Sequence, residues 1–98
     1  MELTEMRASE TSEYHVEVPV RVLDDLGLHA RPAAKLAQAA LQFEADIKLL
    51  TEDASADAKS ILDILSLSAT KGTHMTIRCT GPDATEAAKA ITTLFFQD

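Results

Sequence analysis

The spacing of apolar residues changes repeatedly along this chain of 98 residues, and that change constrains its fold more than any other feature. From Val16 to Val22, valines alternate with other residues, as in a half-buried strand. Pro19 cannot donate a ladder hydrogen bond, so we expect this strand at a sheet edge, or bonded on one side only at that point. Apolar residues then recur at helical spacing over residues 33–43. Because Pro32 fits only a first turn, this helix is expected to start close to His29.

Strand-like and helix-like spacings of apolar residues also alternate through the second half of the chain. A turn is expected at residues 24–27, further strands at 46–51, 54–58 and 75–79, and further helices at 60–67 and 83–95. Each of those two helices begins with a capping-box pattern, Ser60 with Asp63 and Asp83 with Glu86. The resulting order, β-α-β-β-α-β-α, predicts an α+β fold in which three helices pack on a single face of one sheet.

Composition and charge narrow the classes of protein to which the chain can belong. Aromatic residues make up only 4% and tryptophan is absent, so the core must be built from Val, Ile, Leu and Ala. The formal net charge of -7 repels phosphate backbones, so we expect no binding to nucleic acid. The longest apolar runs fall far short of the roughly 20 residues that span a bilayer, so we expect no membrane insertion.

One domain is expected at residues 14–98, preceded by a flexible acidic tail at residues 1–13. The tail lacks the apolar stretch of a secretory signal, and the single cysteine, Cys79, cannot form an internal disulfide. A cytoplasmic location, where thiols stay reduced, is therefore expected. Three scattered histidines and one cysteine do not form a pattern that binds a metal, so we expect no metal site.

The segment from Leu28 to Pro32 concentrates the residues that could carry chemistry. His29 follows a glycine turn at the start of a helix, where free backbone N–H groups and the positive end of the helix dipole favour anions. The same field disfavours a positive ring and so favours a neutral, nucleophilic imidazole. Arg31 could clamp phosphoryl oxygens with its planar fork of donors. These features predict reversible phosphoryl transfer to His29.

Each of these residues also has a purely structural interpretation. His29 could be a helix cap or a surface residue, Pro32 a helix initiator, and Arg31 a solvated side chain. The other two histidines are expected to be structural, His15 at the start of a strand and His74 in a loop.

Two segments of the chain resemble one known family. The segment from Gly27 to Ala33 looks like the active-site signature of HPr, the histidine-containing phosphocarrier of the phosphoenolpyruvate-dependent phosphotransferase system. A second segment, Ala58 to Leu62 followed by Leu-Ser-Leu at 65–67, is similar to the serine-site helix of that family. The resemblance runs from about Val16 to Phe95. It implies an open-faced β-sandwich in which four antiparallel strands carry three helices on one face.

The resemblance also implies a function. A protein of this kind is a carrier and not an enzyme. It accepts a phosphoryl group on His29 from phosphorylated enzyme I and passes it to an enzyme IIA domain. We expect a monomer without a cofactor, with Arg31 as the phosphate clamp, and the choice between the tele and pros nitrogens of His29 stays open.

The serine-site helix has two further roles in the family. The residue matching Ser60 is phosphorylated in many members by a dedicated HPr serine kinase/phosphorylase, although an N-cap role would explain Ser60 by itself. At least one of Ile61, Leu62 and Leu65 is expected in the core. Because the family docks partners through this patch and the first helix, Leu62 and Leu65 are expected to be partly exposed.

Some positions depart from the sugar-uptake members of the family. Asp63 stands where they often have a small residue, and Gln38 and Leu41 occupy the outer part of the first helix, where they often carry basic residues. Residues 69–72, 80–82 and 94–95 look more like the nitrogen-related branch, NPr. Sugar uptake and nitrogen-linked regulation both stay open. The alternative function is a regulatory module that docks target proteins through the Ser60 helix under the control of serine phosphorylation.

Overall fold

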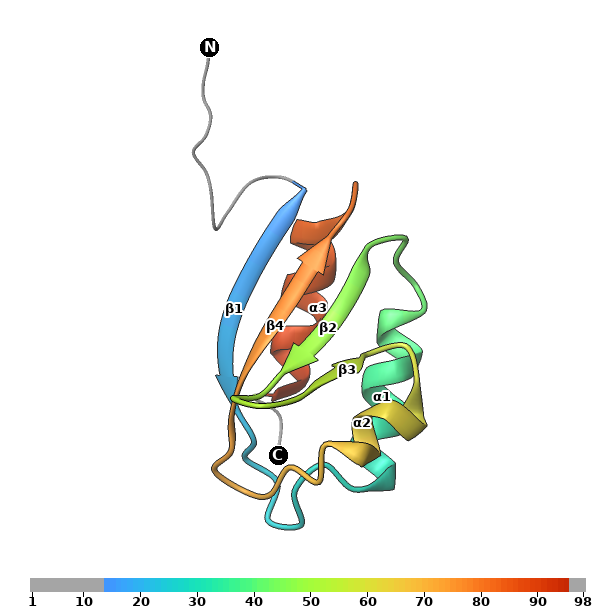
Figure 1. Ribbon diagram of the computed structural model, residues 1–98. Coiled ribbons are helices and arrows are strands. Elements are labelled where there is room, and N and C mark those ends of the chain that lie inside the picture. The colour runs from blue at the N-terminus through green and yellow to red at the C-terminus, as the bar shows by residue number, and fades with distance from the viewer. Residues whose placement is uncertain (1–13, 96–98) are drawn as a thin grey trace.

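The computed structural model describes residues 14–95 (Figure 1). The expected tail, residues 1–13, and the last three residues of the expected domain lie outside this range. The elements follow one another in the predicted order: β1 (His15–Arg21), α1 (Ala30–Ala40), β2 (Asp46–Leu50), β3 (Ser55–Asp57), α2 (Ile61–Ser66), β4 (His74–Thr80) and α3 (Ala84–Phe95). His74, expected in a loop, is instead the exposed first residue of β4.

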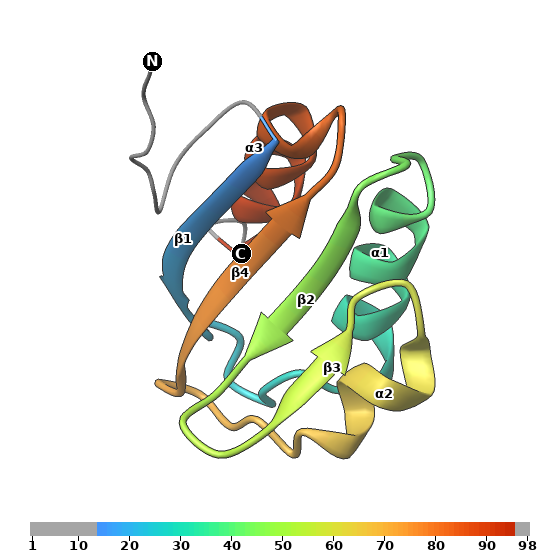
Figure 2. The same ribbon diagram turned by 45° about the horizontal axis from the view of Figure 1, so that its top comes forward.

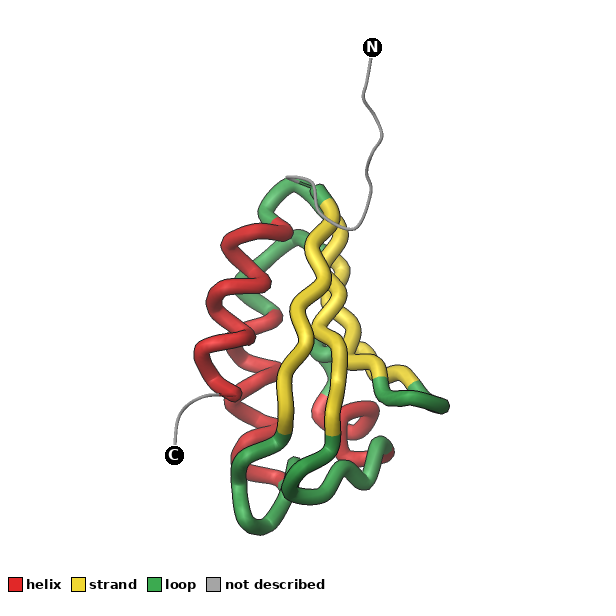
Figure 3. Tube along the Cα trace, turned by 90° about the vertical axis from the view of Figure 1, so that its left-hand side faces the viewer, coloured by secondary structure: helices red, strands yellow, loops and turns green. Residues whose placement is uncertain are grey.

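The four strands form one antiparallel sheet in the order β1-β4-β2-β3 (Figure 2). β1 is an edge strand, as Pro19 predicts, and Pro19 faces Thr76 of β4 in the ladder. Viewed along the sheet, α1 and α3 lie together on one side of it (Figure 3). The shorter α2 lies beside α1 and next to β3. The predicted α+β architecture is therefore confirmed.

The core lies between the sheet and these helices. The inward faces of the two central strands supply most of its largest fully buried side chains, which Val22, Ile64 and Ile91 complete. Both long helices face the sheet mainly with alanine. Alanine at these positions lets the helix backbones come close to the sheet, which suits a core without tryptophan. The buried residues of the strands and long helices are Val20, Ala33, Leu36, Ala37, Ala40, Ile47, Leu49, Ala56, Met75, Ile77, Cys79, Ala84, Ala87, Ala88, Ile91 and Phe95.

The capping boxes are realised only in part. Ser60 caps α2, since its hydroxyl oxygen accepts from the N–H of Asp63 at 3.2 Å, but the Asp63 carboxylate accepts from the N–H of Asp57 and does not return to Ser60. Asp83 directs both carboxylate oxygens away from its own helix. They accept from the N–H groups of Glu44 and Ala45 at 2.9 and 2.8 Å.

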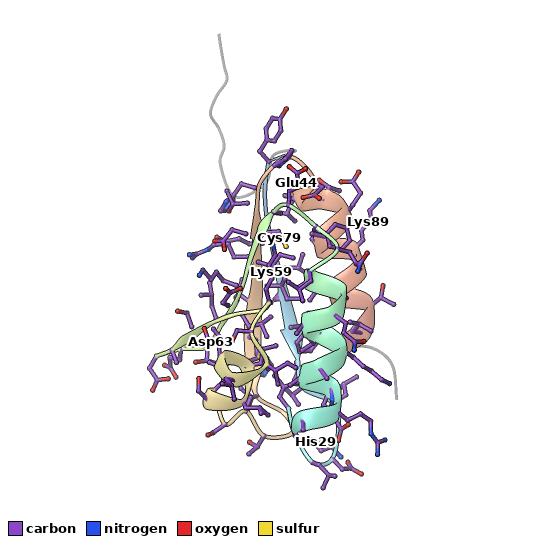
Figure 4. All side chains as sticks on the ribbon, turned by 90° about the vertical axis from the view of Figure 1, so that its right-hand side faces the viewer. His29, Glu44, Lys59, Asp63, Cys79 and Lys89 are labelled. Carbon is purple, nitrogen blue, oxygen red and sulfur yellow. The ribbon has the colours of Figure 1, made fainter. Side chains whose placement is uncertain are left out.

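The C-terminal end of α1 is tied down by these contacts and by a lysine. Leu41 continues the helical spacing of apolar residues, but the helix has ended at Ala40 and the Leu41 side chain is exposed. Beyond it, the Lys59 ammonium donates to the carbonyl oxygen of Phe43 at 2.8 Å. Lys59 directly precedes the cap of α2 (Figure 4), so this hydrogen bond links the end of α1 to the start of α2.

No helix within residues 14–95 is long and apolar enough to cross a membrane.

Candidate functional site

The loop between β1 and α1 is closed by one aspartate. The backbone carbonyl of Asp24 accepts from the N–H of Gly27 at 2.9 Å, and its Oδ1 accepts from the N–H of Leu26 at the same distance. This side-chain contact two residues along the chain is an Asx turn, so the turn expected at residues 24–27 is confirmed with Asp24 as its organiser.

Gly27 brings this loop against the loop that follows α2. Its φ of +74° lies in the left-handed region, and a Cβ built on it would lie 2.4 Å from the carbonyl oxygen of Ala69. The same Ala69 oxygen accepts from the N–H of Leu28 at 2.9 Å. Only a residue without a side chain allows so close an approach, and the contact fixes the backbone directly before His29.

His29 is the N-cap of α1 and keeps its ring free of capping (Figure 4). Its backbone is extended, with φ -82° and ψ -173°, and its side chain makes no cap hydrogen bond. The Nε2 atom lies 3.4 Å from Oδ2 of Asp24, and 30% of the side chain is exposed. The first N–H groups of a helix have no partner within it, so the ring stands beside a surface suited to an anion.

Arg31 is exposed one residue into α1 and makes no hydrogen bond or ion pair with another residue in the range 14–95. It lines a cavity of about 130 Å³ together with Asp24 and Lys35, and the same lining includes the buried Leu36 and Phe95. The guanidinium therefore lies at the same end of α1 as His29 with its donors uncommitted.

Asp24 is a charged group close to both of these side chains. The pKa of its carboxyl lies below its ordinary value, first because the N–H of Leu26 donates to it, and further because His29 and Arg31 lie close by, although partial desolvation opposes the shift. The carboxylate form is therefore favoured beside the His29 ring.

The residues predicted on the second helix form a separate group on α2. Leu62 is 78% exposed and Ile61 41% exposed, while Leu65 is partly buried and packs against the core. The partial exposure expected of Leu62 and Leu65 is confirmed, but the expectation that at least one of Ile61, Leu62 and Leu65 lies in the core is wrong. The one fully buried residue of α2 is Ile64, which the sequence reasoning passed over, because a helix of six residues turns only one narrow face inward.

Two features of the site escaped the sequence analysis. The contact between Gly27 and Ala69 joins residues far apart in the chain, and no local pattern signals it. The Asx turn has a local signal in the sequence, because Asp24 stands two residues before the N–H group that donates to its carboxylate. The contact between Asp24 and His29 has no such signal. Among residues 14–95 no group of three His, Cys, Asp or Glu side chains is placed to hold a metal ion.

Comparison with known proteins gives one consistent result. Residues 16–97 match the family model described as the PTS HPr component phosphorylation site. The chain is 41% identical over 76 residues to the phosphocarrier protein HPr of Treponema pallidum, which covers 78% of this chain and 86% of that protein. It is 40% identical over 81 residues to the HPr of Vibrio cholerae, covering 83% and 95%. The crystal structure of HPr from Bacillus anthracis superposes with a TM-score of 0.78 at 40% identity, covering 83% and 96%.

The close approach at Gly27 generates a prediction about stability. In Gly27→Ala, the new methyl group meets both an unfavourable backbone conformation and the Ala69 carbonyl. In the control Gly72→Ala, φ is also positive, at +91°, but nothing lies within 4 Å of the new Cβ, so only the conformational cost of about 1–2 kcal/mol applies. We expect Gly27→Ala to lose roughly 1–3 kcal/mol more than the control in urea unfolding. Equal losses of stability in the two variants would show that the close approach of Gly27 to Ala69 does not constrain the two loops.

Proposed function

This chain belongs to the HPr family of phosphocarrier proteins of the phosphotransferase system, and we propose that it carries its phosphoryl group on the imidazole of His29. The observation that carries this assignment is the position of the ring. His29 caps α1 through its backbone and makes no side-chain cap, so the imidazole lies at the helix N-terminus without a structural task there. Neither His15 nor His74 stands at the start of a helix, since both are strand residues.

Arg31 is proposed as the clamp on the transferred group. Its guanidinium has no partner among residues 14–95, so binding phosphoryl oxygens would not first require an ion pair to break. A planar fork of donors matches two phosphoryl oxygens at once, and the helix N-terminus adds a favourable field for the same negative charge. Both features stabilise a phosphoryl group as it arrives at His29.

We propose that the group comes from phosphorylated enzyme I and leaves to an enzyme IIA domain, in the cytoplasm, with the protein acting as a monomer. HPr proteins of the phosphotransferase system work with such enzymes. The exposed Ile61 and Leu62, with the partly exposed Leu65, supply an apolar patch on α2 for docking. Genes for transporter components beside this one would favour sugar uptake, and a gene for an alternative nitrogen sigma factor would favour the nitrogen-related branch.

Ser60 is proposed as a site of regulatory phosphorylation that acts on docking. It precedes the apolar patch directly, so a phosphate there would place charge at the edge of the contact surface. The same exposure of Leu62 favours the second candidate function, a regulatory module that docks targets through α2. The two functions differ in a measurable way, since only the carrier needs His29 to accept and release a phosphoryl group.

Replacement of His29 tests the carrier assignment directly. With phosphoenolpyruvate and enzyme I, we expect the parent protein to acquire an acid-labile, base-stable adduct and His29→Ala to acquire none. His15→Ala and His74→Ala serve as controls and should label as the parent does. Full labelling of His29→Ala would refute the assignment.

Replacement of Arg31 tests the clamp. A charge-assisted hydrogen bond is worth about 1.5–3 kcal/mol, so Arg31→Ala should slow transfer roughly ten- to hundredfold if the contact is made mainly in the transition state. Lys35→Ala removes a positive charge one turn further along α1 and is expected to have a much smaller effect. Transfer rates in both directions should be followed by rapid quenching, with a melting curve for each variant. Unchanged rates for Arg31→Ala would remove this residue from the site.

Replacement of Ser60 tests the regulatory role. Ser60→Asp places negative charge at the favourable end of α2, so we expect an unchanged or higher melting temperature together with a raised apparent KM for enzyme I. Ser55→Asp adds the same charge on β3, outside the apolar patch, and should leave KM near the parental value. A sharp loss of stability in Ser60→Asp, or kinetics identical to the parent, would show that Ser60 is only a structural cap.

A further inference from the structure

We propose that the cavity between the start of α1 and the end of α3 is a binding site for a small monocarboxylate whose apolar body is about as large as one six-membered ring. The carboxylate of the ligand pairs with Arg31 and Lys35, and its ring fills the space behind them. Binding therefore withdraws Arg31 from the transferred phosphoryl group. This last step rests on the proposed clamp role of Arg31, whereas the binding site itself does not.

Three segments of the chain enclose the cavity. The loop between β1 and α1 contributes Leu28, the first two turns of α1 contribute Leu36, and the end of α3 contributes Leu94 and Phe95. Leu28, Leu36 and Phe95 are buried, and Leu94 packs against the core. The two helices contact each other, and the start of α1 and the end of α3 lie at the same end of the molecule (Figure 4). The apolar walls are therefore part of the folded core.

The volume and the lining of the cavity set the size of the ligand. The cavity measures about 130 Å³. An apolar protein cavity of about 150 Å³ takes up one benzene molecule, so a single ring fits here and two fused rings do not. Poorly ordered water against apolar walls is displaced with a gain in affinity. A phosphate or a sugar buried among the leucines would instead lose hydrogen bonds to water without finding new partners.

The charged groups at the cavity select an anion. Among the described residues that line it, Arg31 and Lys35 are cationic and Asp24 alone is acidic. The Asp24 carboxylate is already engaged, since Oδ1 accepts from the N–H of Leu26 and Oδ2 lies 3.4 Å from Nε2 of His29. Neither cation makes a side-chain hydrogen bond or ion pair within residues 14–95. A carboxylate can therefore accept from both cations without breaking an existing contact.

Occupation of the cavity has a consequence for phosphoryl transfer. A bound carboxylate and a phosphoryl group on His29 compete for the same guanidinium donors of Arg31. The ligand therefore acts as an inhibitor of transfer that covers neither the His29 ring nor the apolar patch on α2. Control of this kind would make the activity of the carrier respond to the concentration of a small carboxylic acid.

Binding is tested with benzoate, which combines one ring with one carboxylate. In ¹H–¹³C methyl spectra of the full chain, we expect the signals of Leu28, Leu36 and Leu94 to shift with a dissociation constant on the order of 1 mM. Three matched compounds remove one feature each: acetate lacks the ring, benzyl alcohol lacks the charge, and 2-naphthoate exceeds the cavity. Each should bind at least about tenfold more weakly than benzoate.

Two variants test the position of the ligand. Lys35→Ala should weaken benzoate binding about two- to fivefold, the range for one exposed ion pair. Lys89→Ala is the control, because Lys89 is exposed on α3, far from His29, and does not line the cavity (Figure 4). Leu94→Trp fills the cavity and should abolish binding. Melting curves show whether this variant folds, and Lys35→Ala tests the site if it does not.

The effect on transfer is read from phosphorylation by enzyme I and phosphoenolpyruvate. At a benzoate concentration of about three times the dissociation constant, the rate for the parent should fall about fourfold by mass action. The rate for Leu94→Trp should not respond to benzoate, which excludes an action of benzoate on enzyme I. In Lys35→Ala, inhibition should require about two to five times more benzoate, in step with the weaker binding.

Four results would overturn the proposal. Methyl signals that stay unchanged at roughly tenfold the expected dissociation constant would remove the binding site. Equal binding of benzyl alcohol would remove the role of the two cations. Benzoate binding that appears only after deletion of residues 96–98 would show that the chain itself occupies the cavity. Bound benzoate that leaves the transfer rate unchanged would remove the competition for Arg31. Failure of the carrier function is distinct, because the methyl spectra require no enzyme I.

Discussion

The antiparallel pairing of β1 with β4 is the interaction on which the remaining structure depends. It joins two segments separated by most of the domain, from His15 facing Thr80 to Arg21 facing His74. Backbone hydrogen bonds continue the pairing beyond the strands: Val22 donates to Thr73, and Gly72 donates back to Val22. The two loops at this end of the sheet are thereby brought together, and Leu28 can reach Ala69. The position of His29 is thus set by a sheet whose strands do not contain it.

The chemistry available at the site depends on the exposure of the N-terminus of α1. α1 buries its alanine face against the core, yet its first turn extends to the rim of the sheet, where His29 and Arg31 remain partly or fully exposed. The core therefore fixes the helix axis while solvent reaches its N-terminus. A histidine deeper in the helix would be as well ordered but would lack the free N–H groups that favour a phosphoryl group.

Sequence reasoning located every helix and strand in order because periodicity is a local property. The edge position of β1 was also predictable, since Pro19 has no N–H to give to a neighbouring strand. Contacts between distant segments were not predictable. The capping pattern of Asp83 was sound as a local signal, but two N–H groups of the loop at Glu44 and Ala45 compete for its carboxylate. The candidate residues His29 and Arg31 were identified from a short segment, whereas Asp24 emerged only when the turn was seen to fold back onto the ring.

The hydrogen bond from Lys59 to Phe43 has a mechanical consequence. It joins the loop that follows α1 to the residue that precedes the cap of α2, so the two helices are connected at a point remote from His29. If partners dock on the apolar patch of α2, as proposed, they meet the His29 imidazole at a separation that the fold has already set, and little orientational entropy remains to be lost as the reacting groups approach. Under that proposal, successive partners would have to present their reacting groups at one common distance from the patch.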